Sequence, residues 1–138
     1  MWQIGRVSAR EVLPVRQAVL WPDRPAEFSQ IADDAEGWHF GVHADGQLAC
    51  IASLFLRDGQ VRLRKFATLP EWQGRGLGSA MLRHCMEVSR QAGAYMFWCD
   101  ARLDAVPFYR RRSLYEDGAP FVRDGQGFIR MTCVLNAA

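Results

Sequence analysis

The sequence predicts an α+β fold, in which a mixed and mostly antiparallel sheet of six to seven strands is flanked by helices. Three observations support this class. Apolar and polar residues alternate with a period of two through much of the stretch 37–68, as they do in strands. The period becomes helical after Gly76, and the run 94–99 is then apolar throughout, which is typical of a strand buried on both faces. With 138 residues, the chain is expected to form one domain over 1–138.

Composition and charge exclude several classes of protein. Apolar residues make up 49% of the chain and charged residues 23%, which is an ordinary balance for a globular domain. A net charge of +2 is too small to predict nucleic-acid binding. No stretch approaches the roughly 18 consecutive apolar residues that cross a bilayer, and the first residues show no signal-peptide pattern. We therefore expect a cytoplasmic protein with no membrane and no nucleic-acid partner.

The cysteines are widely spaced in apolar segments and form no C-x-x-C pair. They are Cys50, Cys85, Cys99 and Cys133. This usage is typical of buried thiols in a reducing compartment.

A first helix is predicted from Ser8 towards Leu20. Ser8 and Glu11 fit a capping box, which satisfies the first free amides of a helix. Pro14 should weaken or kink this helix. The segment 21–36 has a turn-like composition with room for a short second helix, and it either lines a substrate cleft or serves as a connector.

The alternating segments that follow should form an antiparallel meander. Asp45-Gly46 and Asp58-Gly59 are both favoured two-residue hairpin turns, and they separate three strands. These strands are predicted over 37–44, 47–57 and 60–68. Asp124-Gly125 predicts a third hairpin near the C-terminus.

A helix and a buried strand should come next. The helix ends at Gly93, a residue that can adopt positive φ. Its predicted buried residues are Leu77, Met81, Cys85, Val88 and Ala92. Because strand–helix–strand crossovers are right-handed, the strand 94–99 should run parallel to the strand 60–68. Asp104 can then cap a short helix that has Pro107 in its first turn.

The stretch from Gln73 to Ser79, which reads Gln-Gly-Arg-Gly-Leu-Gly-Ser, lies between a strand and a helix. Its glycines allow the backbone to approach a ligand closely, and the first amides of the following helix lack intrahelical partners. The helix dipole adds partial positive charge at this end. The stretch is therefore predicted to bind a phosphate or pyrophosphate, the alternative being a glycine-rich turn without chemical use.

A dinucleotide-binding domain is one alternative for this loop. Gly74 and Gly76 match part of a G-x-G-x-x-G pattern that here ends in Ser79, and Asp100 lies where a ribose-binding acid would be expected. However, these glycines follow an antiparallel meander rather than the first strand of a doubly wound sheet. The chain also has no room for a second mononucleotide-binding half.

Two motifs resemble those of the GNAT-family N-acetyltransferases. Gln73-x-x-Gly76-x-Gly78 is similar to the Q/R-x-x-G-x-G/A motif, the loop that holds the pyrophosphate of coenzyme A. Asp100-Ala101-Arg102, followed by Ala105 and Phe108-Tyr109, is similar to the family's N-A-R-x-x-A-x-x-F-Y segment. One helix and one strand separate the two motifs, as the family requires, and the similarity extends over 8–135.

The resemblance implies a GNAT-like domain in which splayed parallel strands hold acetyl-CoA as a cosubstrate, without a metal. Backbone groups of residues 66–68 would contact the pantetheine arm and the acetyl carbonyl, and amides between Gly74 and Ser79 would hold the pyrophosphate. The implied cofactor-binding residues are Phe66, Ala67, Thr68, Gln73, Gly74, Arg75, Gly76, Leu77, Gly78, Ser79, Asp100 and Phe108. The alternatives are a solvated loop charge for Arg75 and a core position for Phe108 and for Tyr109.

The resemblance also implies that Tyr109 is the general acid, since a phenol with a pKa near 10 can protonate the leaving thiolate of coenzyme A. The general base is not evident, because the strand 60–68 contains no acid. The other candidates, none with a strong claim, are Glu36, His39, Glu71 and Glu116. The predicted reaction is direct attack on the thioester by a primary amine of a small molecule or peptide. No covalent intermediate on a cysteine is expected.

Several residues depart from the family pattern. Asp100 stands where the family has asparagine, Ser113 where it has a turn glycine, and Phe128 where some relatives have histidine. The arginine run 110–112 is either a solvated helix face or contacts the 3′-phosphate of the coenzyme. Because of these departures, a non-catalytic CoA-binding regulatory module is the alternative to an enzyme.

The acceptor is the least constrained part of the prediction. Arg64, Lys65 and the region 21–39 are predicted to shape its pocket, and cations there would suit a carboxylate-bearing acceptor such as an amino acid. The tryptophan and phenylalanine content leaves room for a homodimer interface.

Overall fold

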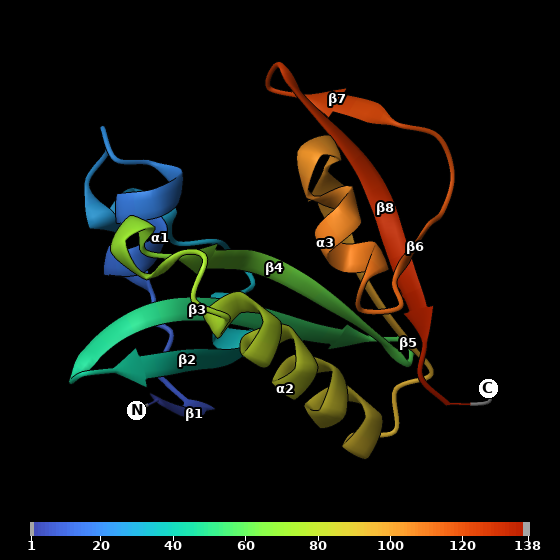
Figure 1. Cartoon of the computed structure of the whole chain (residues 1–138), viewed down its shortest axis with the longest axis horizontal. Coiled ribbons are helices and arrows are strands. Elements are labelled where there is room, and N and C mark those ends of the chain that lie inside the picture. Colours follow the sequence, from blue (N-terminus) through green and yellow to red (C-terminus); the bar gives the residue numbers. More distant parts are fainter. Residues whose placement is uncertain (1, 137–138) are drawn as a thin grey trace.

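The computed structural model describes residues 2–136, which build a mixed sheet of eight strands with helices packed against it (Figure 1). The strands are β1 (Trp2–Arg6), β2 (Trp38–Ala44), β3 (Gln47–Arg57), β4 (Gln60–Thr68), β5 (Met96–Arg102), β6 (Tyr115–Glu116), β7 (Phe121–Arg123) and β8 (Gln126–Val134). The α-helices are α1 (Leu13–Leu20), α2 (Leu77–Gln91) and α3 (Val106–Arg110). Short 3₁₀ turns are η1 (Ala26–Ser29), η2 (Asp34–Glu36), η3 (Pro70–Trp72) and η4 (Leu103–Ala105). The predicted α+β class is confirmed.

The strands follow the order β1-β2-β3-β4-β5-β8-β6, and β7 pairs with β8. Neighbouring strands are antiparallel except β4 and β5, which run parallel, as the crossover through α2 predicts. The sheet has eight strands where the sequence predicts six to seven. The difference arises at the edges, because β1 is largely exposed and β6 has 2 residues, so neither carries a clear period-two pattern.

The three predicted hairpin turns are confirmed, and so are the strands that the first two turns connect. Both central residues of each turn have positive φ, the conformation that matches the twist of the flanking strands. The turns are Asp45-Gly46, Asp58-Gly59 and Asp124-Gly125.

Helix α1 begins at Leu13 rather than near Ser8, so the predicted start is wrong. The capping-box contacts do form, with the Ser8 amide donating to Glu11 Oε1 at 2.8 Å and the Glu11 amide donating to Ser8 Oγ at 3.1 Å. They stabilise a turn, and the helix starts after it because Pro14 lies in the first helical turn. Proline needs no hydrogen-bond partner for its nitrogen there, so it begins the helix instead of kinking it.

Arg16 anchors α1 to the rest of the fold. Its side chain is fully buried and donates to both carboxylate oxygens of Asp34 at 2.9 Å. It also donates to Ser53 Oγ on β3 at 3.0 Å and to the Ser29 carbonyl oxygen at 3.0 Å. The segment 21–36, which forms 3₁₀ turns and no second α-helix, is thereby attached to α1 and β3.

Strands β4 and β5 pair over a short distance and then separate. Their pairs are Gln60↔Met96, Val61↔Phe97 and Arg62↔Trp98. Beyond these pairs, β4 continues beside β3 to Thr68, whereas β5 continues beside β8 to Arg102 (Figure 1). The sheet therefore opens between β4 and β5, as the resemblance implies.

A β-bulge in β4 lies beside this opening. Ser53 pairs with Arg64 and Ile51 pairs with Ala67, so two residues of β4 face a single residue of β3. The two are Lys65 and Phe66, and Lys65 has a φ of 55°, a left-handed conformation that is rare for lysine. The bulge interrupts the alternation of β4, which the sequence pattern did not predict.

The helix and strand that follow the glycine-rich loop largely match prediction. Helix α2 buries Leu77, Met81, Leu82, Cys85 and Ser89, whereas Ala92 lies beyond its end and is exposed. Strand β5 is not buried on both faces, because its residues alternate between buried and half-buried. All four cysteines are free; three are buried and Cys133 is half-buried. Within the described part of the chain, no helix is both long and apolar enough to cross a membrane.

Candidate active site

The loop after β4 leads to an open helix N-terminus. Gln73 Nε2 donates to the Thr68 carbonyl oxygen at 2.9 Å, which ties the loop to the end of β4. Gly74 and Gly76 have φ values of 75° and 90°, a left-handed backbone that favours glycine. Helix α2 starts at Leu77, and Gly76 is its N-cap residue. Among residues 2–136, no side chain at this position caps the first amides of the helix. The loop therefore presents free backbone N–H groups at the positive end of the helix.

A cavity of about 710 Å³ runs along this loop and reaches α3. Its size lies within the range of about 300 to 1,000 Å³ that is common for ligand sites. It brings together most of the predicted cofactor-binding residues. Those that line it are Phe66, Ala67, Thr68, Gln73, Gly74, Gly76, Leu77, Gly78, Ser79 and Phe108. Arg75 and Asp100 are not among them, and the Arg75 guanidinium instead lies over the Trp72 ring at 4.8 Å.

Arg112 contacts the end of the glycine-rich loop from beyond α3. Its guanidinium donates to Ser79 Oγ in the first turn of α2 and to the Phe108 carbonyl oxygen at 2.8 Å. It also lies over the Phe108 ring at 4.1 Å. A charged, bidentate donor thus stands beside the free amides of α2, where a phosphate would bind.

The other arginines of the run 110–112 have different surroundings. Arg110 forms a bidentate ion pair with Glu116 at 2.8 and 2.6 Å, and Arg111 is exposed. Ser113 has a φ of 68°, so it adopts the left-handed turn conformation in which the resembling family has glycine. The three arginines of the run therefore do not share one role: one is ion-paired, one is exposed and one contacts the glycine-rich loop.

Tyr109 lies on α3, is 8% exposed and lines the cavity beside Phe108. Burial raises the pKa of its hydroxyl well above 10, and the neighbouring Cys99, to which the hydroxyl is hydrogen-bonded, raises it further. Burial also raises the pKa of the Cys99 thiol to about 12. At neutral pH, Tyr109 is therefore protonated and can act as a proton donor, whereas Cys99 is a poor nucleophile.

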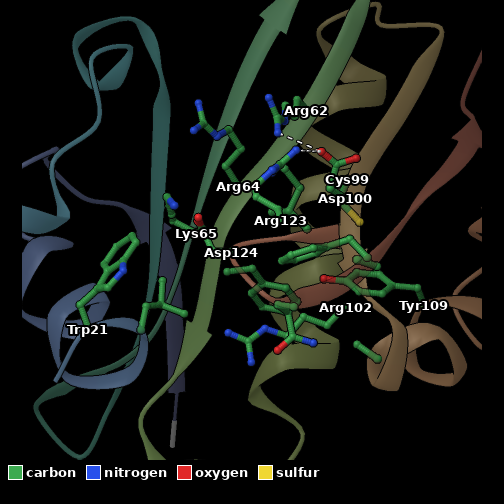
Figure 2. A pocket seen from close by; sticks show the side chains of 17 residues that line it. Trp21, Arg62, Arg64, Lys65, Cys99, Asp100, Arg102, Tyr109, Arg123 and Asp124 are labelled. Carbon is green, nitrogen blue, oxygen red and sulfur yellow. Dashed lines mark hydrogen bonds and ion pairs between the residues drawn. The ribbon is translucent and has the colours of Figure 1, made fainter. Parts of the chain in front are cut away.

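A second cavity, of about 560 Å³, also has Tyr109 in its lining (Figure 2). It is lined by residues of α1, β4, β5 and the β7–β8 hairpin, including several arginines, Lys65 and Phe128. The two cavities share five lining residues. These are Leu20, Phe66, Arg102, Ala105 and Tyr109. The two cavities therefore adjoin where β4 and β5 have separated, and ligands in each of them would lie close together beside Tyr109.

The model of the acetyltransferase (GNAT) family matches residues 7–113, which is more than half of the chain. The chain belongs to the GNAT acetyltransferase family. It is 30% identical to the uncharacterised N-acetyltransferase YitI of Bacillus subtilis over 136 residues, covering 92% of this chain and 91% of YitI. It is also 33% identical to aminoglycoside N(6′)-acetyltransferase type 1 of Stenotrophomonas maltophilia over 100 residues, covering 63% of this chain and 65% of that protein.

Solved structures share the fold of this GNAT acetyltransferase. The ribosomal-protein-S18-alanine N-acetyltransferase of Escherichia coli has a TM-score of 0.81 at 18% identity, covering 100% of this chain and 96% of that chain. A GNAT family acetyltransferase from Elizabethkingia anophelis, solved with acetyl-CoA bound, has a TM-score of 0.76 at 12% identity, covering 97% and 98%. With the family match and the sequence relatives, this protein is an acetyltransferase enzyme.

Asp100 lies in the second cavity of this GNAT enzyme and away from the glycine-rich loop. Its carboxylate accepts hydrogen bonds from Arg62 at 3.2 Å and Arg123 at 3.4 Å, and it lies 3.5 Å from Arg130 Nε. It caps no helix. Asp104, which the sequence predicts as a cap, makes no capping bond either, because α3 is preceded by η4 and starts one residue after Ala105.

The candidate general bases lie outside both cavities. His39 is buried, with Nδ1 at 2.7 Å from Ser53 Oγ and Nε2 at 2.8 Å from the Asp34 carbonyl oxygen, so both ring nitrogens serve the fold. None of the candidates predicted from sequence lines either cavity. Lys65 does line the second cavity, and burial followed by the charge of neighbouring arginines lowers its pKa to about 8. The sequence alone does not predict this property, because it depends on the bulge in β4.

The dinucleotide-binding alternative does not fit this enzyme. Its sheet has a parallel pair at β4 and β5 within an antiparallel order, and not the doubly wound parallel sheet that two mononucleotide halves require. Among residues 2–136, no group of three or more His, Cys, Asp or Glu side chains is placed to hold a metal ion.

Proposed function

We propose that this GNAT enzyme transfers the acetyl group of acetyl-CoA to a primary amine of a small molecule, by direct attack of the amine on the thioester. The observation that supports this most strongly is the meeting of the two cavities beside Tyr109. The cavity along the glycine-rich loop would take the coenzyme, and the cavity lined by arginines would take the acceptor.

The coenzyme would be held largely by backbone groups. Its pyrophosphate would accept hydrogen bonds from the amides between Gly76 and Ser79, with Arg112 as the neighbouring cation. Among residues 2–136, no strand pairs with the β5-facing side of β4 beyond Arg62. The amide groups of a pantetheine arm can therefore pair with residues 66–68 as an added strand would.

The chemistry would require one proton donor and no enzyme-bound intermediate. The amine nitrogen forms a bond to the carbonyl carbon, the C–S bond breaks, and the sulfur takes its proton from the Tyr109 hydroxyl. The amine loses one proton to solvent or to a base, and that proton returns Tyr109 to its neutral form. Cys99 remains a thiol because its pKa is raised to about 12.

A thiol-release assay with acetyl-CoA and a panel of primary amines tests this function, together with a thermal-shift titration of coenzyme A. We expect stabilisation of the fold by coenzyme A and catalytic release of its thiol with at least one amine. Absence of a thermal shift at millimolar coenzyme A, or stabilisation without turnover across the panel, would overturn the proposal. The second outcome is the result that a non-catalytic CoA-binding module would give.

We further infer that the enzyme acts in the cytosol and as one domain over 1–138. The support for the compartment is that all four cysteines are free thiols, which persist in reducing surroundings. A homodimer stays a prediction from composition.

A further inference from the structure

The second cavity is strongly cationic, and this property bears on the acceptor of the proposed reaction. Its lining includes five cationic side chains, from Arg62, Arg64, Lys65, Arg102 and Arg123. The opposing carboxylates in the lining are Asp100 and Asp124. The excess of positive charge faces the space that the acceptor would occupy if the coenzyme lies along the glycine-rich loop.

The fold gathers these cations from distant parts of the chain. Arg62 and Arg64 are two residues apart on β4 and share a face, because side chains alternate along a strand. The bulge brings Lys65 to the same cavity, and β7 contributes Arg123. All four side chains line this cavity, and in Figure 2 Arg62 and Arg123 lie beside Asp100, whereas Lys65 lies towards Trp21.

The two carboxylates that line the cavity do not balance its five cations. Asp100 alone contacts Arg62, Arg123 and Arg130, at 3.2, 3.4 and 3.5 Å, and its side chain is 7% exposed. Arg64 lies 3.5 Å from Asp33, a side chain that is 60% exposed and so contributes a screened contact.

Lys65 is a half-buried cation whose contacts do not neutralise its charge. Among the described residues, no carboxylate lies within salt-bridge distance of its amine, which instead lies over the Trp21 ring at 4.6 Å. Burial, and after it the positive charge of Arg64, lowers its pKa to about 8. An anionic ligand in the cavity would relieve this repulsion, because it would supply the missing opposite charge.

We propose that the acceptor is a primary amine that also carries a carboxylate, and that Arg62, Arg64, Lys65 and Arg123 bind this carboxylate while the amine lies beside Tyr109. This inference rests on the proposed function. A carboxylate matches the planar donors of arginine, whereas a polycationic amine would be repelled by the same side chains.

Matched amines test the proposal. Initial rates of thiol release would be measured for amino acids from glycine to 6-aminohexanoate, and for the amino alcohol and diamine of equal chain length. We expect the best carboxylate to exceed its matched alcohol and diamine in kcat/KM by about tenfold or more, in line with about 1.4 kcal/mol for one ion pair. Equal or better use of alcohols or diamines would overturn the inference while leaving amine acetylation intact.

Two variants test whether Arg64 and Lys65 cause the preference for a carboxylate. Arg64→Gln and Lys65→Met should each reduce the ratio of kcat/KM between the best carboxylate and its matched alcohol, by about tenfold. Arg57→Gln, which removes an exposed charge at the end of β3, should leave this ratio unchanged. A ratio that is the same in all three variants and the wild type would contradict the assignment, and a melting curve establishes that each variant is folded.

A binding measurement tests the carboxylate site without requiring acetyl transfer. If no amine is acetylated, the proposed function fails, and the cavity can still be probed with coenzyme A present. Calorimetry would compare 4-acetamidobutyrate with N-(4-hydroxybutyl)acetamide. Tighter binding of the carboxylate, weakening as salt increases, supports an anion site, and equal or absent binding of the two overturns it.

Discussion

Arg62 donates to Asp100 across β4 and β5, with Nη2 3.2 Å from Oδ2, at the point where the pairing of these strands ends. Arg62 is the last residue of β4 that pairs with β5, opposite Trp98, and its guanidinium lies over the Trp98 ring at 4.7 Å. An ion pair and a cation–π contact therefore hold the two strands together where they begin to separate. Both Arg62 and Asp100 also line the second cavity.

Asp100→Ala should destabilise the fold, because Arg62 and its arginine neighbours would lose the carboxylate they share. The arginines are partly exposed, so we expect the free energy of unfolding to fall by about 1 to 2 kcal/mol. Urea unfolding measures this change, with Asp117→Ala on the exposed surface as the control. An unchanged midpoint for Asp100→Ala would mean that the ion pair does not hold the strands together.

Arg112→Gln should weaken the binding of coenzyme A, since its guanidinium lies beside Ser79 at the open end of α2. We expect the dissociation constant to rise about tenfold, the amount that one charge-assisted contact commonly contributes. Calorimetric titration with coenzyme A measures this change. The neighbouring Arg111 is exposed, so Arg111→Gln is the matched control, and equal affinities for the two variants would argue against a phosphate role for Arg112.

Tyr109→Phe should lower kcat by about 100-fold with little change in the KM for acetyl-CoA, because it removes the proton donor and preserves the packing. Tyr115→Phe, at a side chain that is 60% exposed, is the matched control. Since the pKa of Tyr109 is raised well above 10, wild-type activity should not decline through tyrosine ionisation between pH 7 and 10. Full activity of the Phe variant would exclude Tyr109 as the acid.

Lys65 should make the stability of the free enzyme depend on pH in a particular direction. Burial and the nearby arginines lower its pKa from 10.5 to about 8, so between these values the unfolded chain binds more protons here than the folded protein does. The free energy of unfolding of the wild type should therefore rise with pH relative to Lys65→Met between pH 8 and 10.5. Below pH 8, the charged lysine destabilises the folded protein by its full amount. Urea unfolding at several pH values measures the difference, and a difference independent of pH would be inconsistent with a depressed pKa.

The sequence predicts the turns and helix starts of the enzyme, because these depend on residues that are adjacent in the chain. Gly76 precedes a helix and Asp58-Gly59 closes a hairpin whatever surrounds them, and Pro107 in a first turn predicts the short helix that carries Tyr109. The bulge that gives Lys65 its position depends on pairing between β3 and β4, which period-two alternation alone does not specify. Sequence spacing also could not show that Arg112 meets Ser79 from 33 residues away.

A crystal structure with coenzyme A bound tests the central claim most directly. The account predicts the diphosphate at the amides between Gly76 and Ser79, and the sulfur at the meeting point of the two cavities, within hydrogen-bond reach of the Tyr109 hydroxyl. A coenzyme bound elsewhere, or a sulfur that points away from Tyr109 and from the cationic cavity, would contradict it.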